Sequence, residues 1–334
     1  MITLVAQLAP QRSTQYADLA RTLAQQELQL SPVGRLATHL RWRRWGGQAY
    51  LAFDLPALPD DIQLCELGML AMTSAFFRYH EQIGEVDGPF LQPLETHFTP
   101  ALPPDLVMTR RYRGKTNELF THFLCNIARF SSGFAHQPWP ALRVLDPLAG
   151  GGTTLFMALV LGAQVAGIEQ NGDDVKSTVT FLHQYARGEG IACQVKEERL
   201  KRLGWRWVFA IGKKPPRQCI LAHGDTVQAQ ALLPGYRPHL IVTDLPYGIQ
   251  HQGKLVELLA SALPVWANLL VRGGVLVFSW DASRFPRAEM VALVEATSPL
   301  AVCNDPPYNE LGHRVDRVIK QRDVLVARPC KGDA

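Results

Sequence analysis

The sequence lacks the features that mark several common protein classes. Its six cysteines form no C-x-x-C pair and no cysteine-histidine spacing typical of zinc, so neither a metal site nor a disulfide framework is indicated. No apolar run is long enough to cross a membrane, and the first residues lack the basic segment of a signal peptide. We therefore expect a cytoplasmic protein with reduced cysteines, no metal and no membrane association.

The chain also has little net charge and no internal repeat. It carries a formal charge of +4 over 334 residues, with 47% hydrophobic and 19% charged residues, which is ordinary for a globular protein. This length allows one large α/β domain and a smaller companion. The small positive charge permits a polyanionic partner but does not require one. Local clusters of basic residues must therefore indicate whether and where such a partner binds.

Residues 1–105 predict a small α+β domain. Strands and helices are expected in the order βαββαβ, which suits a ferredoxin-like unit that serves as an RNA-binding or auxiliary domain. Five prolines between residues 85 and 105 disfavour regular elements and predict a semi-rigid connection. Residues 106–334 then alternate strands with helices, which predicts a mostly parallel sheet covered on both faces.

Three successive glycines follow an apolar strand in the segment from Asp146 to Thr154. Glycine lacks a Cβ atom and tolerates positive φ, so a ligand can approach such a turn closely. The segment is not a dinucleotide motif, because Leu155 stands where the third glycine would be, and no P-loop Gly-Lys-Ser/Thr follows. A tight turn that serves packing alone is the alternative.

Acidic residues end the next two expected strands. Glu169 lies where a carboxylate can accept from both ribose hydroxyls of an adenosine. Asp225 and Thr226 close the third strand, and an aspartate there can bind an adenine amine. One acidic strand end is ordinarily only solvated, but Asp146, Glu169 and Asp225 in succession favour an adenosine-containing ligand.

The segment Asp244-Leu245-Pro246-Tyr247-Gly248 ends a fourth strand. An exocyclic amine of a base is a poor nucleophile because its lone pair is delocalised into the ring. The Asp244 carboxylate and the Leu245 carbonyl are suited to accept its two N–H bonds while Tyr247 stacks on the base, so these residues with Pro246 are the catalytic candidates. The later segment from Asn304 to Asn309 contains Asp-Pro-Pro-Tyr, but it follows the late strands, so we expect a turn or a pocket wall there.

Four segments together resemble the class I S-adenosylmethionine methyltransferases, and more narrowly the tRNA guanine-N2 methyltransferases. The resemblance covers roughly residues 110–328 and is carried by residues 111–117, 146–154, 244–248 and 313–315. It implies a Rossmann-like, seven-stranded sheet and S-adenosylmethionine as cofactor. Leu245 departs from the common D-P-P-Y form and removes one fixed φ. The cofactor-binding residues on this reading are Thr116, Asn117, Asp146, Ala149, Gly150, Gly152, Thr153, Glu169, Asp225, Thr226 and Asp244.

Basic residues interleaved with Trp205 and Trp207 predict contacts to unpaired bases, although a solvated charged face is the alternative. Little chain remains after Tyr247 for a DNA-recognition domain, which favours RNA. The candidates for nucleic-acid contact are Arg43, Arg113, Lys201, Arg206, Lys213, Lys214 and Arg217.

We therefore expect methyl transfer from S-adenosylmethionine to guanine N2 in tRNA. Three alternatives stay open. One is an adenine N6, cytosine N4 or guanine N2 amine in DNA or rRNA, and another is the glutamine amide of a protein. The last is a non-catalytic RNA-binding module with a vestigial cofactor pocket.

Overall fold

The computed structural model describes residues 1–10, 18–112, 114–246, 252–315 and 320–330. The chain forms two compact units, one of Met1–Thr99 with Asp305–Gln321 and one of Pro100–Asn304 with Arg322–Ala334. This division differs from the predicted boundary between residues 105 and 106. Residues 305–321 join the N-terminal unit because β14 (His313–Arg314) packs against α1 (Leu19–Leu30), a contact between distant segments that no local pattern reveals.

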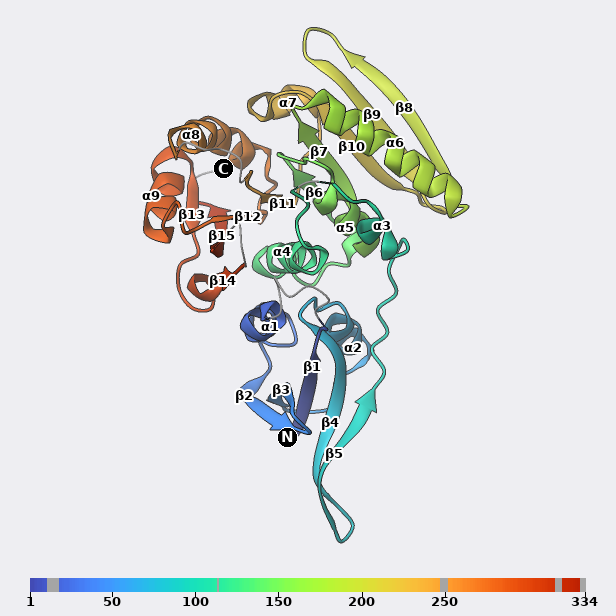
Figure 1. Ribbon diagram of the computed structural model, residues 1–334, viewed down its shortest axis with the longest axis vertical. Coiled ribbons are helices and arrows are strands. Elements are labelled where there is room, and N and C mark those ends of the chain that lie inside the picture. Colours follow the sequence, from blue (N-terminus) through green and yellow to red (C-terminus); the bar gives the residue numbers. More distant parts are fainter. Residues whose placement is uncertain (11–17, 113, 247–251, 316–319, 331–334) are drawn as a thin grey trace. The chain divides into compact units, whose positions relative to one another are not determined.

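The N-terminal unit is built on an antiparallel sheet (Figure 1). Its strands have the order β2-β3-β1-β4-β5, and the first six elements follow the chain order βαββαβ. Leu4, Leu51 and Phe53, which share one face of β1 and β3, are fully buried. The remaining elements are β1 (Ile2–Leu8), β2 (Thr38–Trp45), β3 (Gln48–Leu55), α2 (Asp61–Gly68), β4 (Thr73–Ile83) and β5 (Val86–Leu94).

Strand β5 corrects the expectation that prolines exclude regular structure after residue 85. The strand contains Pro89 and Pro93 and pairs with β4 only. It is the edge strand of its sheet, and proline is tolerated at an edge because the missing N–H need not face a neighbour.

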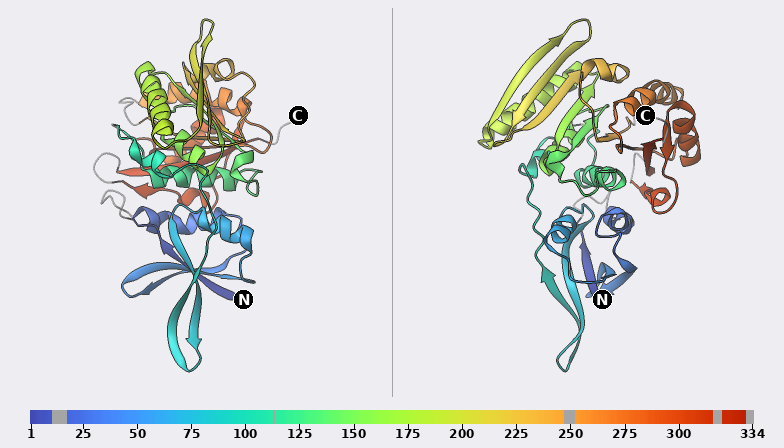
Figure 2. Two further views of the ribbon diagram at one scale, coloured as in Figure 1. Left: turned by 90° about the vertical axis from the view of Figure 1, so that its right-hand side faces the viewer. Right: turned by 180° about the vertical axis from the view of Figure 1, so that it is seen from behind.

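The second unit contains the predicted Rossmann-like, mostly parallel sheet, which is confirmed (Figures 1 and 2). Its strand order is β13-β15-β12-β11-β6-β7-β10-β9-β8. The five parallel strands, numbered along the chain, have the order 3-2-1-4-5, which is the doubly wound arrangement. The strands from β13 to β10 are β6 (Arg143–Asp146), β7 (Gln164–Glu169), β10 (Arg217–His223), β11 (Leu240–Asp244), β12 (Val275–Asp281), β13 (Leu300–Val302) and β15 (Gln321–Pro329).

Helices cover both faces of this sheet. On one face α7, α8 and α9 enclose a core with alternate strand residues such as Leu145, Ile168 and Ile241. On the other face α4, α5 and α6 contact the sheet. The helices are α3 (Asp105–Thr109), α4 (Glu118–Ser131), α5 (Thr153–Leu161), α6 (Gly172–Gly188), α7 (Ala229–Leu232), α8 (Gln252–Leu269) and α9 (Arg287–Thr297). Among the described residues, no helix is both long and apolar enough to span a membrane.

A β-hairpin extends the sheet beyond the seven predicted strands. Strands β8 (Cys193–Leu200) and β9 (Gly204–Ile211) pair with each other, and β9 pairs antiparallel with β10. The register sets Trp205 opposite His223 and Ile211 opposite Arg217. One end of the hairpin, at the turn between β8 and β9, therefore lies at the edge formed by the carboxyl ends of the parallel strands. The other end, between β9 and β10, lies at the edge formed by their amino ends.

Candidate active site

The acidic strand ends lie at one edge of the sheet, as the sequence predicts. Strands β6, β7, β10 and β11 are parallel, so their carboxyl ends share an edge. Asp146, Glu169 and Asp244 are the last residues of their strands, and Asp225 follows β10 by two residues. This edge is the expected position for a ligand in a doubly wound sheet.

Asp146 is the most deeply buried of these carboxyls, with 2% of its surface exposed. Burial raises its pKa to about 6, and the nearby Asp244 carboxylate adds to the increase. The Thr243 and Thr154 hydroxyls oppose it, as does the Leu148 N–H, which donates to Asp146 Oδ1 at 3.1 Å. A cationic group placed beside Asp146 would favour its charged form.

The glycine turn adopts the conformation for which glycine is suited. Gly150 and Gly152 have φ of +49° and +86°, a region that other residues rarely adopt. No heavy atom lies within 4 Å of the Cβ position at Gly150, so the turn is open there. Glu169 Oε2 accepts from the Gly150 N–H at 2.8 Å, and Oε1 accepts from the Asn171 N–H at 2.7 Å. Glu169 thus links the turns after β6 and β7.

Gly151 has a different role, which the sequence did not reveal. A Cβ atom there would lie 2.2 Å from Cζ of Tyr112, so this glycine admits the Tyr112 ring. The Tyr112 hydroxyl forms a hydrogen bond with the Thr153 hydroxyl, and burial raises the pKa of Tyr112. The sequence marks Tyr112 only as part of a motif, and its partner at Gly151 depends on the fold.

Arg110 also belongs to this packing. It is 8% exposed and donates to the Gly151 carbonyl, to Thr178 Oγ1 at 2.5 Å and to Ser177 Oγ at 2.9 Å. The Arg110 side chain is thus buried against the glycine turn.

Asp244 is held by residues from three other segments. The Thr116 hydroxyl donates to Oδ2 at 2.5 Å, and the Ser279 hydroxyl donates to Oδ1. Arg322 Nη2 lies 3.8 Å from Oδ2, with its side chain 2% exposed and its guanidinium over the Phe120 ring. Thr116, nominated from the sequence, is thus beside Asp244, whereas Ser279 and Arg322 were missed because they lie on later strands without a motif.

The residues that follow Asp244 are only partly described. The Leu245 N–H donates to the Ser279 carbonyl at 2.9 Å, and the Leu245 side chain is buried. Pro246 is exposed. Tyr247, the predicted stacking residue, lies outside the described residues.

Other nominated residues form hydrogen bonds within the protein itself. Asn117 Oδ1 accepts from the Phe120 N–H at 3.0 Å and caps α4. The Ala149 N–H donates to the Ile168 carbonyl at 2.8 Å. Asp225 Oδ1 accepts from the Val227 N–H at 3.0 Å.

Thr226 is buried beside Asp225, and its hydroxyl accepts from Trp266 Nε1 at 2.9 Å. Because Asp225 Oδ1 and the Thr226 hydroxyl already form these hydrogen bonds, a ligand would bind here to backbone groups or to the second carboxylate oxygen of Asp225.

The later segment, Asp305-Pro306-Pro307-Tyr308, forms a turn. The Tyr308 N–H donates to the Asp305 carbonyl at 2.9 Å, and a 3-10 helix, η4 (Tyr308–Glu310), follows. Asp305–Gln321 belong to the N-terminal unit. Asn304 Oδ1 accepts from Arg287 Nε at 3.0 Å.

The predicted nucleic-acid residues of the hairpin separate into two groups. Lys201 is exposed between β8 and β9, at the edge that carries the acidic strand ends. Lys213 and Lys214 are exposed after β9, and the half-buried Arg217 begins β10, so these three lie at the opposite edge. Arg206 is not available as predicted, since Nε lies 2.6 Å from Glu198 Oε2 and only 19% of the side chain is exposed.

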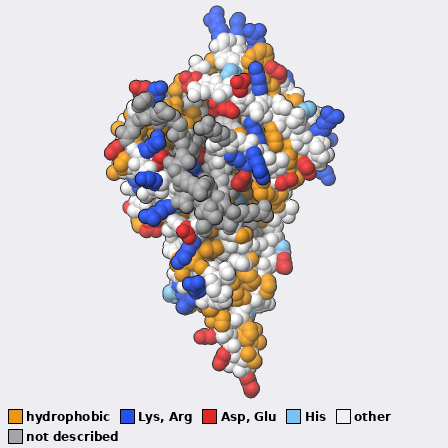
Figure 3. Space-filling model, in the orientation of Figure 1, with side chains coloured by type: hydrophobic (Ala, Val, Ile, Leu, Met, Phe, Trp, Pro, Cys, Tyr) orange, Lys and Arg blue, Asp and Glu red, His pale blue; other side chains and the backbone are white. Residues whose placement is uncertain are grey.

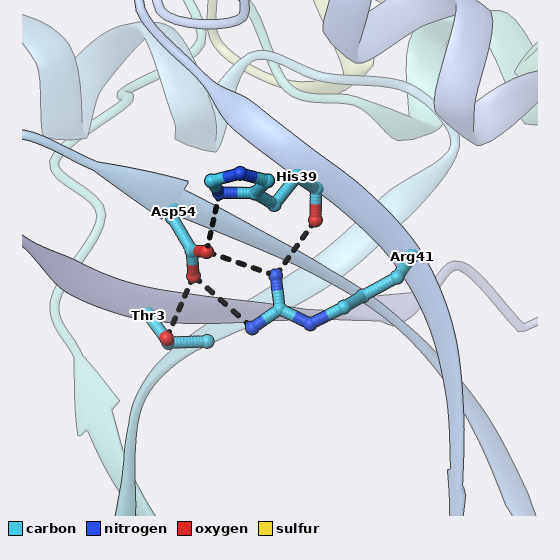
Figure 4. A network of polar contacts seen from close by, with 4 residues as sticks. All are labelled: Thr3, His39, Arg41 and Asp54. Carbon is cyan, nitrogen blue, oxygen red and sulfur yellow. Dashed lines mark hydrogen bonds and ion pairs between the residues drawn. The ribbon is translucent and has the colours of Figure 1, made fainter.

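Arg43 is exposed on β2 of the N-terminal unit. Its neighbour Arg41 is instead bound to Asp54, which also accepts from Thr3 (Figure 4). Although burial opposes it, the hydrogen bonds from Arg41 and Thr3 lower the pKa of Asp54. Arg113 lies outside the described residues.

Comparison with solved structures finds distant similarity. TrmN from Thermus thermophilus aligns over 98% of this chain and 100% of its own, with 13% identity and a TM-score of 0.47. The T. thermophilus 16S rRNA N2 G1207 methyltransferase RsmC aligns over 94% of this chain and 62% of its own, with 14% identity and a TM-score of 0.37. The rRNA methyltransferase aviRa from Streptomyces viridochromogenes aligns over 67% and 91%, with 15% identity and a TM-score of 0.41. No family model and no curated protein sequence matches the chain.

Proposed function

We propose that the protein transfers a methyl group from S-adenosylmethionine to an exocyclic amine of a nucleobase, with guanine N2 in tRNA as the substrate. The proposal rests on the position of Asp244 and on the residues that surround it. Its carboxylate ends a central parallel strand and is oriented by the Thr116 and Ser279 hydroxyls. It therefore presents a preorganised acceptor at the edge where doubly wound sheets bind ligands.

The residues beside Asp244 fit the cofactor. The open, left-handed Gly150 allows close approach, and the buried Asp146 carboxyl suits the cationic methionine end of the cofactor. Glu169 stands at the next strand end, where a carboxylate can accept from ribose hydroxyls. When bound, S-adenosylmethionine supplies an electrophilic methyl group on its sulfonium sulfur.

The chain itself orients the acceptor nitrogen. A carboxylate oxygen of Asp244 accepts an N–H of the amine, which localises the nitrogen lone pair for attack on the methyl carbon. The Leu245 carbonyl is the candidate for the second N–H. As the new N–C bond forms, the bond between the methyl carbon and the sulfonium sulfur would break, leaving S-adenosylhomocysteine, and the proton lost from nitrogen would pass to Asp244 or to water. The Arg322 guanidinium, 3.8 Å from Oδ2, balances the negative charge of the carboxylate in its buried setting.

The test is transfer of labelled methyl from S-adenosylmethionine to total tRNA, rRNA, DNA and protein in separate reactions. Nucleoside analysis of the labelled pool then identifies the product. N2-methylguanosine in tRNA is the expected result. Label only in DNA, rRNA or protein would retain the reaction and replace the substrate, whereas no label in any pool would contradict the proposed function.

A further inference from the structure

A groove lies between α6 and the β8–β9 hairpin and adjoins the acidic edge described above. It consists of two adjoining hollows of about 380 and 410 Å³ that share Glu197 and Trp207. The cross-strand pairs Glu197 with Trp207 and Arg199 with Trp205 place these side chains on one face of the hairpin. The groove is lined from both elements, with Asn171, Lys176 and His183 on one side and Glu197, Trp205 and Trp207 on the other.

Trp205 is the exposed aromatic residue of this groove. It is 40% exposed, and Arg199 Cζ lies 5.6 Å from the centroid of its ring. An indole that is supported by a guanidinium and open on a groove is a stacking platform for another planar group.

The strand register aligns Trp205 with the candidate active site. Trp205 lies opposite His223, and His223 lies opposite Glu169. Two strand spacings correspond to about 10 Å between Trp205 and Glu169, and four spacings to about 19 Å between Trp205 and Asp244. A flexible polymer with one base at Asp244 therefore reaches Trp205 along the same edge of the sheet.

The charges around the groove favour a nucleic acid. Lys201 and Arg202 are exposed at the tip of the hairpin, beside Trp205, and Figure 3 shows basic side chains at this tip, uppermost in the view. Asp173 and Glu197 line the groove itself, so phosphate groups are directed to the tip. Carboxylates in the groove are suited to accept from the amino group of a base.

We propose that this groove holds an unpaired nucleotide of the RNA substrate near the methylated one, with its base on Trp205 and its phosphates at Lys201 and Arg202. The choice of RNA rests on the proposed function. Lys213, Lys214 and Arg217, which the sequence grouped with the tip, lie at the far edge and take no part.

Binding of a labelled single-stranded RNA and of labelled total tRNA, measured by fluorescence anisotropy over a range of salt without cofactor, tests this proposal. Trp205→Ala should weaken binding about 5- to 150-fold through loss of one stacked base, whereas Trp205→Phe should stay within about threefold because a ring remains. Lys201→Ala with Arg202→Ala should reduce the slope of log K against log salt by about 1.4, corresponding to two phosphates.

The matched control is Lys213→Ala with Lys214→Ala, which removes the same charge at the opposite end of the hairpin and should leave affinity and slope unchanged. Wild-type affinity in Trp205→Ala, an equal effect of the control pair, or a preference for DNA of the same sequence would overturn the proposal. RNA binding that depends on Trp205, without methyl transfer to any pool, would retain the groove and contradict only the proposed function. Undiminished RNA affinity in a Trp205→Ala variant that still methylates tRNA would contradict the groove and retain the proposed function.

Discussion

The Thr116 hydroxyl donates a hydrogen bond of 2.5 Å to Asp244 Oδ2, across 128 residues of sequence. Thr116 lies just before the first helix that packs on the sheet, and Asp244 ends a central strand. The bond joins the segment proposed to contact the cofactor to the carboxylate proposed to orient the acceptor amine. The two proposed roles are therefore coupled through this hydrogen bond.

Removal of this donor should lower the rate of methyl transfer. Thr116→Val keeps the shape of the side chain but leaves Asp244 Oδ2 without the hydroxyl, and a hydrogen bond to a charged group contributes about 1.5 to 3 kcal/mol. We expect kcat/KM for tRNA methylation to fall about 10- to 150-fold, while Thr116→Ser retains most of the activity. Equal activity in the valine and serine variants would show that the hydroxyl does not orient Asp244.

Replacement of the Asp244 and Asp305 carboxylates should have opposite outcomes. Asp244→Asn keeps the size of the side chain but removes its charge, so methyl transfer should fall by about a hundredfold or more. Asp305→Asn alters a turn in the N-terminal unit and should leave turnover unchanged. Rates with labelled cofactor under saturating conditions, together with the melting temperature of each variant, separate lost chemistry from lost folding. An active Asp244→Asn enzyme beside an inactive Asp305→Asn enzyme would move the chemistry to the turn.

The buried Asp146 should make the stability of the cofactor-free protein depend on pH. Burial raises its pKa to about 6, whereas an unfolded aspartate titrates near about 3.9. Between these values the folded state holds a proton that the unfolded chain has lost, so the free energy of unfolding falls as pH rises toward 6 and is constant above it. The contribution is on the order of 3 kcal/mol.

Urea unfolding of the wild type and of Asp146→Asn across this pH range measures the effect. The difference between their unfolding free energies isolates the contribution of Asp146 from that of His239. Burial and Arg143 lower the pKa of His239 to about 4, so its contribution to the unfolding free energy rises with pH over the same range. A difference that does not change with pH would contradict the buried setting of Asp146.

Gly151 should tolerate alanine only when Tyr112 is also changed. The added Cβ would lie 2.2 Å from Tyr112 Cζ, so Gly151→Ala should cost about 1 to 3 kcal/mol of unfolding free energy through overpacking. In a Tyr112→Ala background the same change should cost little, because the ring is absent. A double-mutant cycle in urea measures this coupling, and additive effects would show that the ring does not pack on Gly151.

Glu169 should affect the cofactor more than the RNA. A glutamine side chain at this position would offer one acceptor oxygen in place of two, and the N–H groups of Gly150 and Asn171 both use the carboxylate. We expect Glu169→Gln to weaken S-adenosylmethionine binding about 10-fold or more, measured by calorimetry, with RNA affinity unchanged. Glu189→Gln, just beyond the other end of α6, is the control. A larger loss for RNA than for the cofactor would remove Glu169 from the ribose site.

Part of the fold and site could be predicted because it depends on local pattern. Alternating strands and helices indicated the parallel sheet, and the strand ends Asp146, Glu169 and Asp244 could be placed at one edge because parallel strands share a carboxyl edge. The prolines of β5 misled the prediction, since a propensity does not show whether a strand lies at an edge.

The order of the elements, the glycine turn and the residues that end each parallel strand could be read from local patterns, because these features depend on neighbours in the chain. Three relationships required the folded chain: Ser279 and Arg322 contact Asp244, Tyr112 packs on Gly151, and the hairpin separates Lys201 from Lys213. These relationships depend on which strands become neighbours and in what register. That choice is made by burial and hydrogen bonding over the whole sheet, so no single segment of the sequence encodes it.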